Sequence, residues 1–256
     1  GSATLASVLE DDSSPSGSTV SSLFSANFSD VTDAVSGGST ANSLAGVAVT
    51  GYTADATKGE WQYSSDGSTW SAISSIAGAS TARTFASADR FRFVPASNFN
   101  GAAPSLTVIL IESPTTVTTN AVLDVSTRGG TTVYSTGTVV LSHSVTAVND
   151  APVASGSATV ASVNEDSASS TAVTVTSLFS ASFSDSADTV TGGSSANTLA
   201  GIAIIGYTAD ATKGAWQYSA NNITWSAIGS VADATVARTL RSADYVRFVP
   251  AVNFNG

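Results

Sequence analysis

The chain has 256 residues, of which 42% are hydrophobic and only 11% are charged, and its formal net charge at pH 7 is -10. The 19 acidic residues outnumber the 9 basic ones, so the chain lacks the Lys and Arg stripes that binding to nucleic acid requires. The absence of cysteine excludes disulfides and cysteine-ligated zinc, and no apolar run approaches the roughly 18 residues of a membrane span.

The sequence repeats itself over most of its length. Residues 1–101 align with residues 156–256 at a constant offset of 155 positions, and about two thirds of the aligned residues are identical. A period of this length is that of a whole folded module, because solenoid repeats span roughly 20–50 residues. We therefore expect a domain over 1–148, a linker over 149–155 and a second domain over 156–256. The second copy lacks counterparts of residues 102–148 and the chain has no Met, so we expect an internal segment of a longer polypeptide.

Short segments rich in Val, Ile, Thr and aromatic residues alternate with clusters of Gly, Ser, Asp and Asn, which predicts an all-β fold. In the first copy the predicted strands are Ala3–Val8, Ser18–Ser22, Leu44–Tyr52, Glu60–Ser64, Thr69–Ile73, Ala82–Phe85, Arg90–Val94, Ser105–Ile111 and Thr138–Val148. A helical turn is predicted at Ser22–Ser25. About nine short strands are typical of a β-sandwich, so we predict tandem immunoglobulin-like (cadherin-like) β-sandwich domains joined by a short stiff linker.

The clearest local element is a hairpin whose turn contains Asp66-Gly67. This pair suits a tight turn with positive φ, and Asn221-Asn222 at the same place in the second copy tolerates the same geometry. A two-residue turn would place Tyr63 opposite Trp70 as an aromatic cross-strand pair.

The linker between the copies reads Asn149-Asp150-Ala151-Pro152 after an apolar strand. Pro152 fixes its own φ and pushes Ala151 toward an extended conformation. This composition predicts a short and stiff connection, unlike the flexible tether that a run of Gly and Ser would form.

Several motifs recur in both copies and carry a family resemblance. They are the linker Val148–Val153, the pairs Glu10-Asp11 and Glu165-Asp166, the Trp-Gln-Tyr-Ser segments at 61–64 and 216–219, and the segments Phe93–Gly101 and Phe248–Gly256. Together they resemble bacterial cadherin-like tandem repeats, which form the extender regions of giant secreted adhesins, including those of the RTX type. The resemblance covers nearly the whole chain and implies β-sandwich modules, secretion and calcium held at the junctions.

On this resemblance we expect a non-catalytic, extracellular extender segment of a bacterial cell-surface adhesin, stiffened by interdomain calcium and used in adhesion and biofilm formation. Its partners would be neighbouring repeats of the same polypeptide, with a glycan or cell-surface ligand bound through other domains. Cadherins proper carry a longer and more acidic linker motif, so we expect one or two calcium ions at a junction here.

Strand polarity predicts where the calcium ligands lie. The first strand delivers Glu10-Asp11 to the far end of its domain, where the chain also leaves at Asn149-Asp150. The next strand runs back, so the loop with Asp185 and Asp188 in the second copy would face the linker. Oxygen ligands from several chain segments are what six- to eight-coordinate calcium requires. With Asp89 added by analogy with the acidic cadherin loop, the predicted junction ligands are Glu10, Asp11, Asp89, Asn149, Asp150, Asp185 and Asp188.

The same logic predicts half-sites at the two ends of the chain. Asp30 and Asp33 would complete a junction with a preceding domain. Glu165, Asp166 and Asp244 would complete one with a following domain.

Three other interpretations stay open. For an enzyme, the single histidine, His143, lies in phase with Leu141 and Val145 along a strand, which favours a neutral core residue. For a carbohydrate-binding module, Trp61, Tyr63 and Trp70 could form an aromatic platform, although core packing explains them as well. For a filament, the second copy lacks counterparts of the predicted strands 105–111 and 138–148, which a neighbouring chain could donate.

Overall fold

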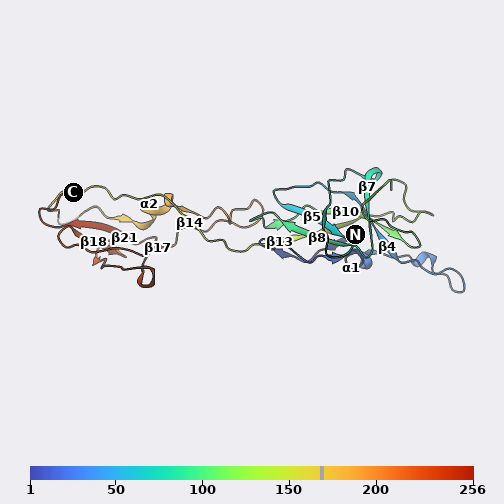
Figure 1. Cartoon of the computed structure of the whole chain (residues 1–256), viewed down its shortest axis with the longest axis horizontal. Helices are drawn as coiled ribbons and strands as arrows, with labels where there is room; N and C mark the ends of the chain where they lie inside the picture. The colour runs from blue at the N-terminus through green and yellow to red at the C-terminus, as the bar shows by residue number, and fades with distance from the viewer. Residues whose placement is uncertain (168–169) are drawn as a thin grey trace. The chain divides into compact units, whose positions relative to one another are not determined.

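The computed structural model in Figure 1 describes residues 1–167 and 170–256. Its secondary structure consists of short strands with a few short helical segments, which confirms the predicted all-β class. The chain forms two compact units. Unit 1 comprises Gly1–Asn149 and Asp188–Ser195, and unit 2 comprises Asp150–Ala187 and Ala196–Gly256. A short loop of the second sequence copy, Asp188–Ser195, is therefore part of the first compact unit.

Unit 1 contains a six-stranded sheet with the order β1-β12-β10-β4-β7-β11. Its strands are β1 Ser2–Thr4, β4 Leu44–Gly51, β7 Ala82–Ala86, β10 Leu106–Glu112, β11 Ala121–Leu123 and β12 Val139–Ser142. All neighbouring strands pair antiparallel except β1 and β12, which are parallel. The central strands β4 and β10 are apolar on both faces, as expected for strands that are covered on both sides.

Two smaller sheets complete unit 1. The four-stranded sheet has the order β3-β8-β5-β6, with β3 Ser18–Thr19, β5 Gly59–Ser64, β6 Ser71–Ala72 and β8 Arg90–Pro95. The three-stranded sheet has the order β2-β13-β9, with β2 Val8–Leu9, β9 Gly101–Ala102 and β13 Ser144–Thr146. The predicted strands Ala3–Val8 and Thr138–Val148 are therefore each divided between the six-stranded and the three-stranded sheet. Strands β9 and β11 were not predicted.

One hydrophobic core receives side chains from the six-stranded and the four-stranded sheet of unit 1. Trp61 of β5 and Phe93 of β8 lie in the same cluster as Val47 of β4 and Leu106 of β10. Trp61 is fully buried, and its ring meets Phe93 edge-on at 5.6 Å between centroids. A second, smaller cluster covers the other face of β10 around Ile109. Burial on this scale supplies the main driving force for folding, since each fully buried large apolar side chain contributes about 1.5–3 kcal/mol.

The first helix begins where the sequence supplies a capping hydroxyl. Helix α1 spans Val20–Phe24, close to the predicted helical turn, and the Thr19 side chain accepts a hydrogen bond from the Ser22 amide. Its Val20 and Phe24 side chains are fully buried in the core. The short 3-10 helices of unit 1 are η1 Ser25–Asn27, η2 Val31–Asp33 and η3 Ala79–Thr81.

The hairpin between β5 and β6 has a longer loop than predicted. Tyr63 pairs with Ser71, so the predicted pair of Tyr63 with Trp70 is wrong by one residue. The loop is held by the Asp66 carboxylate, which accepts hydrogen bonds from the amides of Ser68 at 2.8 Å and Thr69 at 2.7 Å. Gly67 has φ of 75°, and its counterpart Asn222 has φ of 59°, so the predicted left-handed geometry is confirmed. Side-chain acceptors, not a two-residue turn, therefore set this register.

Unit 2 repeats the four-stranded sheet of unit 1. That sheet has the order β15-β21-β18-β19, in which β18 and β21 run side by side (Figure 1). Its strands are β15 Val173–Thr174, β18 Gly214–Ser219, β19 Ser226–Ala227 and β21 Tyr245–Pro250. The remaining elements are β14 Val153–Ala154 with β16 Phe183–Ser184, β17 Gly201–Ile204 with β20 Arg238–Arg241, helix α2 Val175–Phe179, and the 3-10 helices η4 Ser180–Ser182 and η5 Ala234–Val236.

Within the described part of the chain, no helix has the length and apolar character needed to span a membrane.

The stability that the Asp66 loop gives to the β5–β6 hairpin should decrease in acid. The pKa of Asp66 lies well below its ordinary value, first because the Thr69 amide donates to its carboxylate and then because the Ser68 amide and Ser64 hydroxyl do so. A folded-state pKa below the unfolded value of about 3.9 gives stability that is present above that pH and is lost as the pH falls. We expect Asp66→Asn to retain the hydrogen bonds and to flatten the decline of the melting temperature between pH 4 and pH 2.

Unit 2 offers the reciprocal test. There Asn221 already fills the place of Asp66 and accepts from the amides of Ile223 and Thr224. Asn221→Asp should therefore make acid melting steeper. An unchanged acid dependence in both variants, measured by thermal unfolding of the full chain, would contradict the assignment.

Candidate metal centre

Glu10 is a buried acidic residue at the end of the first long segment of unit 1. It directly follows β2, and its amide donates to the Thr146 carbonyl oxygen at 3.1 Å beside β13. The side chain is 4% exposed. Its Oε1 accepts from the Val148 amide at 2.5 Å, and its Oε2 accepts from Asn100 Nδ2 at 2.8 Å. A buried carboxylate must be satisfied by donors or a cation, so Glu10 connects three chain segments.

Asn100 is the neutral partner of Glu10 and also holds a loop. It follows β8 in a turn where Asn98 has φ of 60°, and it is 2% exposed. Its Nδ2 also donates to Ser194 Oγ at 2.8 Å, and its Oδ1 accepts from the Ser194 amide at 2.6 Å. The amide of Asn100 therefore fixes the loop Asp188–Ser195 to unit 1 at both its donor and its acceptor atom.

Internal hydrogen bonds close this loop. The Val190 amide donates to the Ser194 carbonyl at 3.1 Å, and the Gly193 amide donates to the Val190 carbonyl at 3.0 Å. Ser194 Oγ donates to the Asp188 carbonyl at 2.6 Å. Asp188 is 5% exposed. The bond from Asn100 to Ser194 thus also fixes the position of the acidic residue at the start of the loop.

Three carboxylates meet at this place. Glu10, Asp188 and Asp150, which directly follows the last residue of unit 1, each offer an oxygen, and these oxygens lie within 4.8 Å of one another. Calcium binds oxygens at about 2.3–2.6 Å, so two ligands of one ion lie at most about 5 Å apart, and the spacing fits. Without a cation, each close pair of charges would repel by about 1 kcal/mol in water and about 4 kcal/mol near a protein surface. The donor set suits a hard cation such as calcium.

The other predicted junction residues lie in different surroundings. Asp11 and Asn149 are exposed next to Glu10 and Asp150 in the chain. Asp185 is buried in unit 2, where its Oδ2 accepts from the Asn197 amide at 2.5 Å. The group of three carboxylates does not include these residues.

Asp89 has a structural role in its own turn. It lies at the start of β8, and Asn100 lies beyond the end of that strand. Six residues of strand span about 20 Å, so the structure does not bring Asp89 to Glu10. Its carboxylate accepts from the Ala86 amide at 2.7 Å and from Thr119 Oγ1 at 2.8 Å. The cadherin analogy therefore does not apply to this turn.

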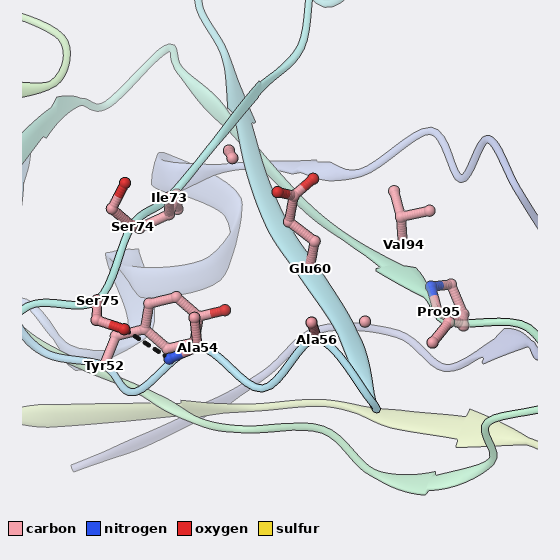
Figure 2. A pocket seen from close by; sticks show the side chains of 12 residues that line it. Tyr52, Ala54, Ala56, Glu60, Ile73, Ser74, Ser75, Val94 and Pro95 are labelled. Atoms are coloured by element: carbon pink, nitrogen blue, oxygen red, sulfur yellow. Dashed lines mark hydrogen bonds between the residues drawn. The ribbon is translucent and has the colours of Figure 1, made fainter.

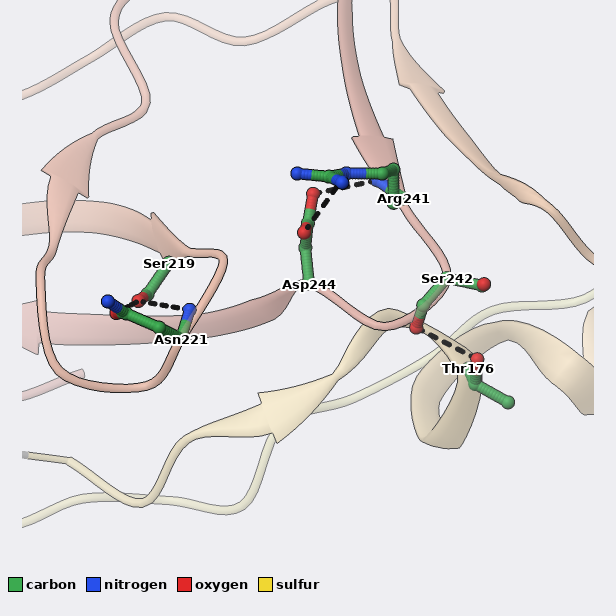
Figure 3. Close-up of polar contacts among 6 residues, drawn as sticks. All are labelled: Thr176, Ser219, Asn221, Arg241, Ser242 and Asp244. Carbon is green, nitrogen blue, oxygen red and sulfur yellow. Dashed lines mark hydrogen bonds and ion pairs between the residues drawn. The ribbon is translucent and has the colours of Figure 1, made fainter.

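Asp244, the counterpart of Asp89 in unit 2, also accepts hydrogen bonds within its own turn (Figure 3). Its carboxylate accepts from the Arg241 amide at 2.8 Å and forms an ion pair with Arg241 Nε at 3.7 Å. Asp244 lies before β21 and Glu165 contacts Asn255 after it, so these half-site residues are not brought together.

The remaining half-site residues are Asp30 and Asp33 of the first copy and Glu165 and Asp166 of the second, where Asp166 accepts from the Asn253 amide at 2.8 Å. Asp30 and Asp33 lie near Glu112, whose pKa is raised by burial and then by the charges of these two aspartates. Sequence reasoning missed Glu112, although its place at the end of β10 opposite Leu44 of β4 follows from the strand pairing. Glu165 Oε2 accepts from Asn255 Nδ2 at 3.1 Å, as Glu10 does from Asn100.

The residues behind the competing interpretations are mostly in the core of unit 1. His143 is buried, with its ring centroid 5.9 Å from Trp61, and burial lowers its pKa, which confirms the predicted core position. Trp61 is fully buried and donates to the Pro104 carbonyl oxygen at 2.6 Å, so it offers no face to a sugar. Trp70 stacks under the Arg92 guanidinium at 4.1 Å.

A hollow beside β5 lacks a converging set of polar groups (Figure 2). Tyr52, Ile73, Val94 and Pro95 supply apolar lining, and Glu60 is the only charged lining residue. Ser75 Oγ accepts from the Ala54 amide at 2.9 Å and so serves the loop itself. This arrangement gives no basis for assigning a ligand.

Comparison of the chain with models of known protein families, with curated proteins and with solved structures gave no match.

The repeat provides a matched pair of variants for the buried amide. Asn100→Ala would remove the donor to Glu10 Oε2 and the acceptor of the Ser194 amide, and we expect a loss of about 2–3 kcal/mol in unfolding free energy. Asn255→Ala removes one exposed bond, and we expect a change within about 0.5 kcal/mol. Urea denaturation of the full chain measures both. An equal loss of unfolding free energy in the two variants would show that the burial of Asn100 does not add to stability.

Proposed function

We propose that this chain is a stretch of a calcium-stiffened, cadherin-like extender of a bacterial cell-surface adhesin. The proposed fold is a pair of immunoglobulin-like β-sandwich modules in tandem. The observation that carries the proposal is the meeting of Glu10, Asp150 and Asp188, two of them buried, with oxygens within 4.8 Å.

The tandem copies support a mechanical role. A whole module is repeated at a constant offset of 155 residues, and repeated modules in one polypeptide add length. In unit 1 the six-stranded and four-stranded sheets share one core, and backbone hydrogen bonds join the strands within each sheet; both features would resist extension. The low charge and lack of cysteine are compatible with a secreted module whose rigidity comes from packing and bound cations.

The proposed calcium site uses oxygens from three segments of the chain. Glu10 lies in the turn after β2, Asp150 lies in the linker, and Asp188 lies in the loop that Asn100 binds. When bound, calcium would neutralise these carboxylates and cross-link the three segments. Because Glu10 Oε1 and Oε2 already accept from Val148 and Asn100, the site is partly ordered before an ion binds.

The extracellular location and the partners follow from the same proposal. The neighbouring repeats of the polypeptide are the primary partners, and adhesion to a glycan or another cell-surface ligand would reside in other domains. Cell-surface adhesion and biofilm formation are the processes that such an extender would serve.

Calcium should stabilise the chain through Asp188. We expect an exothermic or endothermic binding isotherm in calorimetry, and a melting temperature higher by roughly 5–10 °C at a calcium concentration of 100 times Kd. Asp188→Asn should abolish most of this gain. The control is Asp33→Asn, at the same loop position in the first copy, where the residue is exposed.

Two results would contradict the assignment. One is a melting curve and a calorimetric trace that are the same in calcium and in EDTA. The other is an equal loss of calcium stabilisation in both variants, which would place the ion elsewhere.

A filament assembled by strand donation is the second candidate, and a specific hollow in unit 2 favours it. Its apolar lining includes Val160, Phe179, Ile202, Trp216 and Leu240. The counterparts of these residues in unit 1 are all buried in the core, which also contains Leu106, Val108 and Leu110 of β10. The hollow therefore matches a strand with apolar residues at alternate positions.

A peptide of residues 104–113, which contains β10, tests this candidate. We expect it to bind the chain saturably and to raise the melting temperature of unit 2, because its three apolar side chains fit the hollow. A control peptide with Leu106, Val108 and Leu110 replaced by Ser should have no effect. Failure of the first peptide, or equal effects of both, would exclude strand donation at this site.

A further inference from the structure

A second hollow in unit 1 collects charged and polar side chains, unlike the hollow beside β5. Its lining comes from the start of β8, the β5–β6 loop and the segment Ser14–Ser16. Its volume of about 620 Å³ lies within the roughly 300–1,000 Å³ of sites for small ligands. Arg90 and Arg92 both line it, although the whole chain has only 9 Lys and Arg residues. We call this site the arginine hollow.

Arg92 is held in place from three directions. Its Nε donates to Gln62 Oε1 at 2.8 Å, and its Nη1 donates to the Pro15 carbonyl oxygen at 3.2 Å. Its guanidinium also lies over the Trp70 ring, 4.1 Å from the centroid. A guanidinium fixed in this way loses little conformational freedom when a ligand binds. Its Nη2 takes part in neither of these hydrogen bonds and can donate to a ligand in the hollow.

Arg90 is the unpaired cation of the hollow. Its side chain forms no hydrogen bond and no ion pair with any residue that the structure describes. It lies along the β5–β6 loop, where a Cβ added at Gly67 would be 3.3 Å from Arg90 Nε. Arg90 and Arg92 are two residues apart on β8, so they share one face of the sheet with Cα atoms about 7 Å apart. Both guanidinium groups can therefore donate to one ligand.

An ionised carboxylate and several hydroxyls complete the lining. Asp66 Oδ1 accepts the hydrogen bonds that hold the β5–β6 loop, and its low pKa keeps the group charged. Asp66 Oδ2 is not used in these bonds and can accept from a ligand hydroxyl. Ser14, Ser16 and Ser68 are exposed and add hydroxyls. The lining has one net positive charge, which suits a ligand with a single carboxylate beside several hydroxyls, whereas a dense polyanion would be repelled by Asp66.

The second sequence copy has the stacked pair without the unpaired cation. Arg247 lies over the Trp225 ring at 3.9 Å from the centroid, as Arg92 lies over Trp70. Tyr245 occupies the position of Arg90. The stacked pair is therefore common to both units, and a second guanidinium beside it is present at this position in the first copy only.

We propose that the arginine hollow binds a uronic acid residue of an acidic polysaccharide. The sugar carboxylate accepts charge-assisted hydrogen bonds from Arg90 and Arg92, and the ring hydroxyls bond to Asp66 and the serines. An acidic peptide fits less well, because its carboxylates come without neighbouring hydroxyls for Asp66. The site goes beyond the proposed mechanical function, adds to any adhesion through other domains, and shares no residue with the calcium site.

The test is an NMR titration of the isotope-labelled full chain with a tetramer of 1,4-linked galacturonate. The buffer contains EDTA, because uronates chelate calcium and the calcium site must not contribute. We expect saturable shifts of the Arg90 Nε–H and Trp70 indole N–H signals, with a Kd on the order of 1 mM for so small a contact. The Trp225 indole signal is the internal control and should stay unchanged. The methyl ester of the same tetramer, which keeps the hydroxyls and removes the charges, should bind at least about tenfold more weakly.

Two matched variants assign the binding to the hollow. Arg90→Gln should weaken tetramer binding by at least about fivefold and leave the melting temperature unchanged, because the Arg90 side chain has no partner to lose. Arg128→Gln removes the same charge from an exposed position of unit 1 outside the hollow and should bind as the wild type does.

Four results would overturn the proposal. They are no shift at 20 times the expected Kd, equal binding of the tetramer and its methyl ester, equal binding of tetraglutamate, and equal affinity in the wild type and Arg90→Gln. Because the titration is run without calcium, its failure leaves the calcium site and the mechanical function to their own tests.

Discussion

The hydrogen bond between the buried side chains of Glu10 and Asn100 is the constraint on which the acidic end of unit 1 depends. A carboxylate with 4% exposure must find donors, and Glu10 takes them from Val148 on one side and Asn100 on the other. These bonds fix the turn after β2, the turn after β8 and the segment after β13 in one place. Asn100 then uses its remaining amide atoms to hold Ser194, and through that loop Asp188.

The repeat shows what burial adds to this pair. Glu165 and Asn255 form the same hydrogen bond in unit 2, but both are exposed. The pair therefore forms without burial, between two segments that are nearly the same in both copies. Covering the pair turns a bond between two solvated groups into one between buried groups, which then cannot be broken without a desolvation cost.

Sequence patterns predicted the strands of unit 1 well, because alternating apolar residues bounded by turn residues are a local signal. The register of the β5–β6 hairpin could not be predicted, since it depends on which amides the Asp66 carboxylate reaches. Asp89 was misplaced for a similar reason: its partners are Ala86 and Thr119, and Thr119 comes from a distant segment. Asn100 was missed because a search for carboxylates overlooks a neutral amide that orients them.

The acidic loop of the first copy and the pair of Glu10 with Asn100 lie toward opposite ends of strand β10. The loop Asp33–Ser39 lies toward the end of β10 that carries Glu112, since Asp33 and Asp30 act on the pKa of that residue. Glu10 and Asn100 lie toward the start of the strand, near β9 and β13. Seven strand residues separate the two ends by about 20 Å, so the loop Asp33–Ser39 does not reach Asn100 of its own unit. In unit 1 that amide is bound instead by the loop Asp188–Ser195, which comes from the second sequence copy, so the repeat supplies the residue pair and its partner loop from different copies.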